Sequence, residues 1–135
     1  MNRLVLTLFL ACSAMWAECA LAQAIQPNTT WKNNRGSELT ISAVDTTGKL
    51  TGTYVNRAAG FQCQNTPYPV IGWIEDDKIS FSVRWKSVAM DCKSITSWTG
   101  YLSGNRIISD WDLVYTDTGE NRPMLYRGTD YFTKQ

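Results

Sequence analysis

The sequence predicts an all-β domain of eight short antiparallel strands, arranged as a sandwich or as a closed up-and-down β-barrel. Three observations support this prediction. Apolar and polar residues alternate along most of the chain after residue 24, turn-forming residues separate the alternating segments at even spacing, and no segment has the period of an amphipathic helix. Eight strands is also the size at which a closed barrel holds one small ligand.

Each strand is expected where alternation with a period of two runs between turn signals. In chain order, the strands are expected at residues 31–33, 37–44, 50–56, 68–75, 78–86, 94–102, 107–115 and 124–133. Turns rich in Asp, Asn, Gly and Ser are expected at residues 45–48, 76–77, 103–105 and 116–121. The fifth segment alternates most regularly, since Ile79, Phe81 and Val83 share one face and polar residues occupy the other.

Side-chain alternation also predicts which residues point inward. In chain order, the expected inward residues are Ser37, Leu39 and Ile41; Leu50, Gly52, Tyr54 and Asn56; Ile79, Phe81, Val83 and Trp85; Ser94, Thr96, Trp98, Gly100 and Leu102; Ile107, Ser109, Trp111 and Leu113; and Met124, Tyr126, Gly128, Asp130 and Phe132. These faces are apolar at one end, and most gain polar residues or tryptophan toward the other. This gradient favours a barrel with a filled floor and a ligand-binding mouth.

Tryptophans on different expected strands give the clearest functional signal. They are Trp31, Trp73, Trp85, Trp98 and Trp111. At least four share a face with small polar residues, whereas a dry core favours Leu, Ile and Val because a buried indole N–H needs a partner. Large aromatics beside hydroxyls and amides therefore indicate a pocket for a flat polar ligand. Considered singly, Trp31 is better explained as core at the barrel end, and Trp73 as a packing or interface residue.

The N-terminal segment has the pattern of a secretory signal peptide. A short start containing Arg3 precedes an apolar run at residues 4–10, and small-x-small motifs end at Ala22 and Ala24. We expect cleavage after one of these alanines, so that residues 1–24 form the signal and residues 25–135 the folded domain. The apolar run is too short to cross a membrane, and no other stretch is long enough. The chain is therefore expected to be exported, either to the periplasm or outside the cell.

Two cysteines, Cys63 and Cys92, remain after the expected cleavage. Exported proteins meet an oxidising compartment, so a disulfide between them is expected; two separate buried thiols are the alternative. The bridge would close a loop of about thirty residues and stabilise the fold by about 3–4 kcal/mol.

Composition argues against several classes of function. The formal net charge is +1, with no basic patch that would indicate a nucleic-acid partner. The chain has no histidine, which removes the commonest general base and the commonest metal ligand. No catalytic, phosphate-binding or metal-binding motif is present. We therefore expect neither an enzyme nor a metal or cofactor site.

Four ordered segments resemble the strand motifs of the avidin and streptavidin family. They are residues 31–37 (WKNNRGS), 50–54 (LTGTY), 98–100 (WTG) and 128–132 (GTDYF). Each is weak alone, but together they follow the family's order and spacing over essentially the whole mature chain. The resemblance implies an eight-stranded antiparallel up-and-down β-barrel that binds biotin non-covalently at its open end.

The resemblance also implies roles for polar residues at the mouth. Asn33, Ser37 and Tyr54 would donate hydrogen bonds to the ureido oxygen of biotin. Asp130 would accept from one ureido N–H, and Asn56 would accept from the other through its amide oxygen. Three donors on one carbonyl polarise it toward an oxyanion, which strengthens the hydrogen bonds together.

The same resemblance assigns the walls of the site. Trp85, Trp98 and Trp111 would enclose the ring and the tail of biotin. Thr96 would contact the ring sulfur, and Ser94 would lie near the valeryl carboxylate.

Two departures from the streptavidin pattern bear on assembly. Tetrameric members lend a tryptophan to a neighbouring subunit from the stretch before the last-strand aspartate, but residues 121–123 here are Asn-Arg-Pro. The segments around Cys63 and Cys92, expected in loops at the mouth, resemble the dimeric, disulfide-bearing bacterial avidins. The resemblance implies a homodimer rather than a tetramer. It also implies a bridge that pre-orders the binding loops, including residues 57–61, and so substitutes for the lent tryptophan.

Two other functions are compatible with a small exported barrel. One is a protease inhibitor or protein-binding module, which would need no inward polar set. The other is a carrier of a greasy ligand in the manner of a lipocalin, which the inward polar residues disfavour because unpaired buried polar groups are costly.

Overall fold

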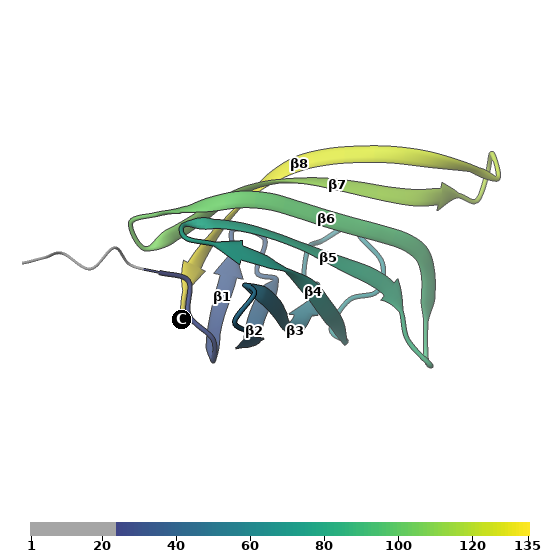
Figure 1. The fold of residues 1–135 in the computed structure, drawn as a ribbon. Helices are drawn as coiled ribbons and strands as arrows, with labels where there is room; N and C mark the ends of the chain where they lie inside the picture. Colours follow the sequence, from purple (N-terminus) through teal and green to yellow (C-terminus); the bar gives the residue numbers. More distant parts are fainter. Residues whose placement is uncertain (1–23) are drawn as a thin grey trace, which may run out of the picture.

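The computed structural model describes residues 24–135, which form a closed barrel of eight antiparallel strands (Figure 1). The strands are β1 (Thr29–Asn33), β2 (Glu38–Val44), β3 (Lys49–Val55), β4 (Pro67–Glu75), β5 (Lys78–Lys86), β6 (Asp91–Ser103), β7 (Arg106–Asp117) and β8 (Arg122–Lys134). Each strand pairs with the next, and β1 pairs with β8 to close the barrel. The predicted up-and-down barrel is confirmed. The predicted signal peptide lies, apart from its last residue, outside the described residues.

The main differences from the expected strand boundaries are at the open end of the barrel. β6 begins at Asp91, three residues earlier than expected, because Asp91 pairs with Lys86 across a register shift that follows Arg84. Cys92 therefore lies within β6, so its expected position in a loop is wrong. β7 and β8 stay paired as far as Asp117 and Arg122, which shortens the expected polar turn. The polar residues there had indicated a turn, but polar residues can also extend the pairing of two strands where that pairing faces solvent.

The expected inward face of β5 forms part of the core. Ile79, Phe81, Val83 and Trp85 are all buried. Phe81 stacks on Trp98 of β6 with ring centroids 4.8 Å apart, which fills the barrel beneath its open end. Burying one such large apolar side chain contributes about 1.5–3 kcal/mol, so this layer is a main source of stability.

The interpretations of Trp31 and Trp73 as residues outside the site agree with their positions. Trp31 is buried at the start of the barrel, and its indole donates to Thr29 Oγ1 at 2.9 Å. Trp73 points outward from β4 and is 56% exposed. Neither residue lines the cavity described below.

Strands β6, β7 and β8 are much longer than β1, β2 and β3 and extend past them on one side of the barrel (Figure 1). Their extended ends form one wall of the open end. Within residues 24–135, no helix is long and apolar enough to cross a membrane.

Candidate functional site

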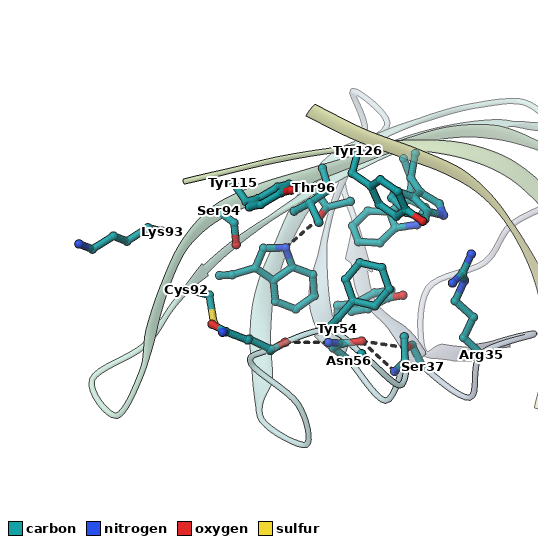
Figure 2. Close-up of a pocket in the computed structure, with 18 of the residues that line it drawn as sticks. Arg35, Ser37, Tyr54, Asn56, Cys92, Lys93, Ser94, Thr96, Tyr115 and Tyr126 are labelled. Atoms are coloured by element: carbon teal, nitrogen blue, oxygen red, sulfur yellow. Dashed lines mark hydrogen bonds between the residues drawn. The ribbon is translucent and has the colours of Figure 1, made fainter. Parts of the chain in front are cut away.

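The open end of the barrel contains a cavity of about 690 Å³ (Figure 2). The structure places all ten predicted site residues on its lining: Asn33, Ser37, Tyr54, Asn56, Trp85, Ser94, Thr96, Trp98, Trp111 and Asp130. They come from β1, β3, β5, β6, β7, β8 and the loops beside them. Barrel closure therefore brings together side chains that are nearly a hundred residues apart in the sequence.

Asp130 provides a buried carboxylate, with its side chain only 3% exposed. Its Oδ2 accepts hydrogen bonds from Asn33 Nδ2 and Trp98 Nε1, both at 3.0 Å. Its Oδ1 accepts from Arg35 Nε at 3.2 Å. These donors offset the high desolvation cost of a buried charge. The result is a negatively charged acceptor held in one orientation.

The turn between β1 and β2 orients the Asn33 amide. Asn33 Oδ1 accepts from the backbone N–H groups of Arg35 and Ser37, at 3.0 and 2.8 Å. Gly36 has φ 86°, a left-handed conformation that favours glycine at this turn. Because the amide oxygen faces the turn, Nδ2 faces the barrel interior, where it also donates to Tyr54 Oη at 3.2 Å.

Tyr54 remains a hydrogen-bond donor well into the alkaline range. Burial raises the pKa of its phenol far above the ordinary value of 10.0, and the negative charge of Asp130 raises it further. A hydrogen bond with the Ser37 side chain and the charge of Arg35 oppose this shift only in part. One side of the cavity therefore carries three side chains that can donate hydrogen bonds: Asn33, Ser37 and Tyr54.

Asn56 connects the cavity to the loop that follows β3. Its Nδ2 donates to the backbone oxygen of Gln62 at 2.9 Å, while its Oδ1 accepts from Ala58 N at 3.0 Å and from Ser37 Oγ at 3.4 Å (Figure 2). The amide oxygen and the Ser37 hydroxyl both lie on the cavity lining, so this oxygen can accept a hydrogen bond from a ligand N–H. The long bond from Ser37 is the one that a ligand can replace at low cost.

The three predicted wall tryptophans have different indole partners. Trp85 Nε1 donates to Thr96 Oγ1 at 2.8 Å, which leaves the Thr96 proton free to point elsewhere (Figure 2). Trp98 Nε1 donates to Asp130, whereas the buried Trp111 Nε1 has no hydrogen-bond partner among residues 24–135. Trp111 lies flat against the backbone of β8, since a Cβ at Gly128 would collide with its indole.

An aromatic cluster beside Trp111 was not predicted from the sequence. The rings of Phe61 and Tyr126 lie 6.2 and 5.7 Å from Trp111 and 6.1 Å from each other. Alternation in the last strand had indicated that Tyr126 points inward, but not that it lines the site. Phe61 ends the segment 57–61 that the resemblance had placed at the mouth, and it lines the cavity. The contact of its ring with Trp111 was not predicted, because a loop carries no periodic signal.

Two cations on the cavity lining were also missed, Arg35 and Lys93. They lie on opposite sides of the cavity in Figure 2. Arg35 lies in the turn between β1 and β2, and Lys93 is an exposed residue near the start of β6. An Arg or Lys at such a position is ordinarily solvated, so composition gave no reason to place either in a site.

The disulfide between Cys63 and Cys92 is present, and it links the loop after β3 to the start of β6. The same loop is held by Gln64 Nε2 donating to Ala58 O at 2.6 Å and by Asn65 N donating to Asn56 O at 2.9 Å. The loop at the mouth is therefore fixed both covalently and by hydrogen bonds.

A closed eight-stranded barrel with a packed floor and a polar, tryptophan-walled mouth defines a small-ligand-binding barrel. The chain belongs to the avidin family, whose model matches residues 21–135. It is 35% identical over 136 residues to afifavidin of Afifella pfennigii, covering 89% of this chain and 84% of that protein.

Solved structures agree with this membership. A structure of apo shwanavidin is 40% identical with a TM-score of 0.75, and the match covers 84% of this chain and 99% of that one. The rhizavidin–biotin complex is 38% identical with a TM-score of 0.75, and the match covers 82% of this chain and 92% of that one.

Proposed function

We propose that this chain binds biotin non-covalently, with the ureido ring against the polar groups of the cavity and the valeryl tail toward its open end. The observation that carries the proposal is the set of Asn33, Ser37 and Tyr54 beside the buried acceptor Asp130, all within one tryptophan-walled cavity. The existence of a biotin complex of the related rhizavidin supports the choice of ligand.

The polar groups of the cavity act on the ureido ring either as hydrogen-bond donors or as acceptors. Asn33 exchanges its 3.2 Å bond to Tyr54 Oη for one to the ureido oxygen, and Ser37 and Tyr54 donate to the same oxygen and stabilise its partial negative charge. The raised pKa of Tyr54 keeps its proton in place. Asp130 accepts one ring N–H, and Asn56 accepts the other in place of the long Ser37 bond. Each buried donor of the ligand thus meets an acceptor, which avoids the cost of unpaired polar groups.

The rest of the cavity fits the remainder of biotin. Trp85, Trp98 and Trp111 cover the ring and the tail, and Thr96 turns its free proton toward the ring sulfur. Ser94 lies near the valeryl carboxylate, and Lys93 beside it supplies a positive charge to that end of the cavity.

Binding without catalysis is the activity that family membership supports. The family's ligand needs no metal or cofactor for recognition, because hydrogen bonds and aromatic contacts supply it. A protease inhibitor or a carrier of an apolar ligand would not use the polar side chains that line the cavity.

Export is supported by the disulfide, because such bonds persist in oxidising compartments. We infer that residues 1–24 are a secretory signal cleaved after Ala22 or Ala24, and that the protein acts in the periplasm or outside the cell. N-terminal sequencing of the protein secreted by its host would locate the cleavage site.

A homodimer is the assembly that the outer surface favours. Ile95, Val114 and Leu125 are adjacent in register on β6, β7 and β8, and each is about half exposed. A row of apolar side chains across three strands fits a second copy of the same face. Light scattering after gel filtration should give the mass of two chains, and a monomer or a tetramer would contradict this proposal.

Retention on a biotin resin tests the function. The folded protein should be retained and eluted only by denaturant, and prior saturation with free biotin should abolish retention. A folded protein that passes through the resin would contradict the proposal.

A further inference from the structure

Arg35 connects two parts of the cavity and has no role in the biotin contacts described above. It lies in the turn between β1 and β2, with its side chain 38% exposed. Its Nε donates to Asp130 Oδ1 at 3.2 Å, and its guanidinium carbon lies 5.5 Å from the centre of the Trp111 ring. Figure 2 shows the side chain at the edge of the cavity. The guanidinium therefore lies beside both the carboxylate and the wall of the site.

Arg35 balances the negative charge of Asp130. Asn33 and Trp98, the donors to Oδ2, are neutral groups that stabilise the carboxylate without cancelling its charge. Among residues 24–135, Arg35 is the one cationic side chain that forms an ion pair with Asp130. With Arg35 in place, the site offers hydrogen-bond acceptors but little net negative charge. Without it, the site would present a buried, unpaired carboxylate, which attracts a cation strongly.

We propose that Arg35 is a specificity-determining residue that makes the cavity select a neutral cyclic urea over a cationic cyclic guanidine. This inference rests on the proposed biotin site. A cationic ring in the position of the ureido ring would place a second positive charge against the same carboxylate, close to Arg35. Like charges at such a distance repel, and low-dielectric walls strengthen the repulsion.

The effect of Arg35 can be separated from that of the donors. Asn33, Ser37 and Tyr54 also oppose a positively charged group at the ureido oxygen position, but they are present in every Arg35 variant. Their contribution therefore cancels when one variant is compared with another. The change in the ratio of two affinities, one for the neutral ring and one for the cationic ring, then reports on Arg35 alone.

The test uses biotin and 2-iminobiotin, whose ring carries an imino nitrogen in place of the ureido oxygen and becomes a guanidinium when protonated. Their dissociation constants would be measured at acidic and alkaline pH for the wild-type protein, Arg35→Gln, Arg35→Lys and Arg106→Gln. Arg106 is the matched control, because its guanidinium also lies over an aromatic ring, 5.2 Å from the centre of Tyr131, at the opposite end of the barrel.

In Arg35→Gln, affinity for 2-iminobiotin at acidic pH should improve about tenfold relative to biotin, and its pH dependence should become shallower. Affinity for biotin itself is expected to fall to some extent, because Asp130 loses one of its donors, so the ratio of the two affinities is the readout. A melting curve checks that the variant is folded. Arg35→Lys should retain the discrimination because it retains the charge, and Arg106→Gln should match the wild-type protein.

Three results would overturn the inference. Loss of affinity for both rings by the same factor in Arg35→Gln would show a structural role only. An unchanged ratio of the two affinities, with biotin still bound, would contradict the inference alone and leave the proposed function intact. A wild-type protein that binds neither ring would overturn the proposed function and this inference together.

Discussion

The floor and the mouth of the barrel are built by the same strands but have different chemistry. On β8, Phe132 is fully buried in the core, while Asp130, its nearest inward neighbour, lies in the cavity. On β7, Ile107 is likewise fully buried in the core, and Trp111 lines the cavity. Alternation therefore decides whether a residue points inward, and its position along the strand decides whether it stabilises the fold or contacts a ligand.

Removing the central acceptor of the mouth should have the largest effect on binding. We expect Asp130→Ala to weaken biotin binding by about 2–5 kcal/mol, because Asn33 and Trp98 lose their acceptor together with the ligand. Biotin release measured by competition would check this. Asp130→Asn is the matched control, since it keeps one acceptor oxygen and the side-chain shape, and it should lose less. An unchanged release rate in Asp130→Ala would contradict the assignment.

A substitution that creates a void in the floor should lower stability and leave biotin binding nearly unchanged. Ile107 is fully buried and does not line the cavity, so Ile107→Ala should lower the free energy of unfolding by about 2–5 kcal/mol. Biotin affinity should stay close to the wild-type value while the barrel remains folded. Denaturant titration and calorimetry would measure the two quantities. A large loss of affinity in this variant would show that floor and mouth are strongly coupled.

The disulfide should affect both regions, with the mouth responding at temperatures where the barrel remains folded. Replacing both Cys63 and Cys92 by serine should lower the free energy of unfolding by about 3 kcal/mol, because the unfolded chain regains loop freedom. Biotin release should accelerate about tenfold, since the loop after β3 must then be ordered on binding. Release and melting temperature would be measured on both proteins. A lower melting temperature with unchanged release would show a bridge that only stabilises the fold.

The fold was predictable because alternation extends along whole strands. In β5, Phe81 and Val83 repeat the same signal on every second residue, and one polar substitution would not erase it. The start of β6 was less predictable. Cys92 follows a register shift, and a β-bulge has no compositional signature of its own.

The candidate site was predictable only in part. Five of the ten residues expected there lie within the four family motifs: Asn33, Ser37, Tyr54, Trp98 and Asp130. The other five were expected at inward positions of strands, where a period of two constrains the spacing. Arg35 contacts Asp130 across 95 residues of sequence, and Phe61 reaches Trp111 from a loop. Contacts of this kind depend on barrel closure and loop conformation, which local patterns do not encode.

Tyr54 lies at the boundary between the floor and the mouth of the barrel. Its ring packs on Trp98 with centroids 4.7 Å apart, and its hydroxyl contacts Asn33. Its pKa is raised by burial above the ordinary 10.0, so the unfolded chain releases this proton at a lower pH than the folded protein does. Stability from this residue is therefore fully present below pH 10.0 and falls as the pH rises above it, by about 1.4 kcal/mol per pH unit.

Denaturant titration of the wild-type protein and Tyr54→Phe at increasing alkaline pH would measure this contribution. Above pH 10.0 the free energy of unfolding of the wild-type protein should fall relative to that of Tyr54→Phe. The reason is that phenylalanine cannot ionise in the unfolded chain. Biotin binding by the wild-type protein should persist in the same range, since the folded phenol keeps the proton that it donates. A stability difference that does not vary with pH would place the Tyr54 hydroxyl in a solvated mouth, and the boundary between floor and mouth would then lie below this residue.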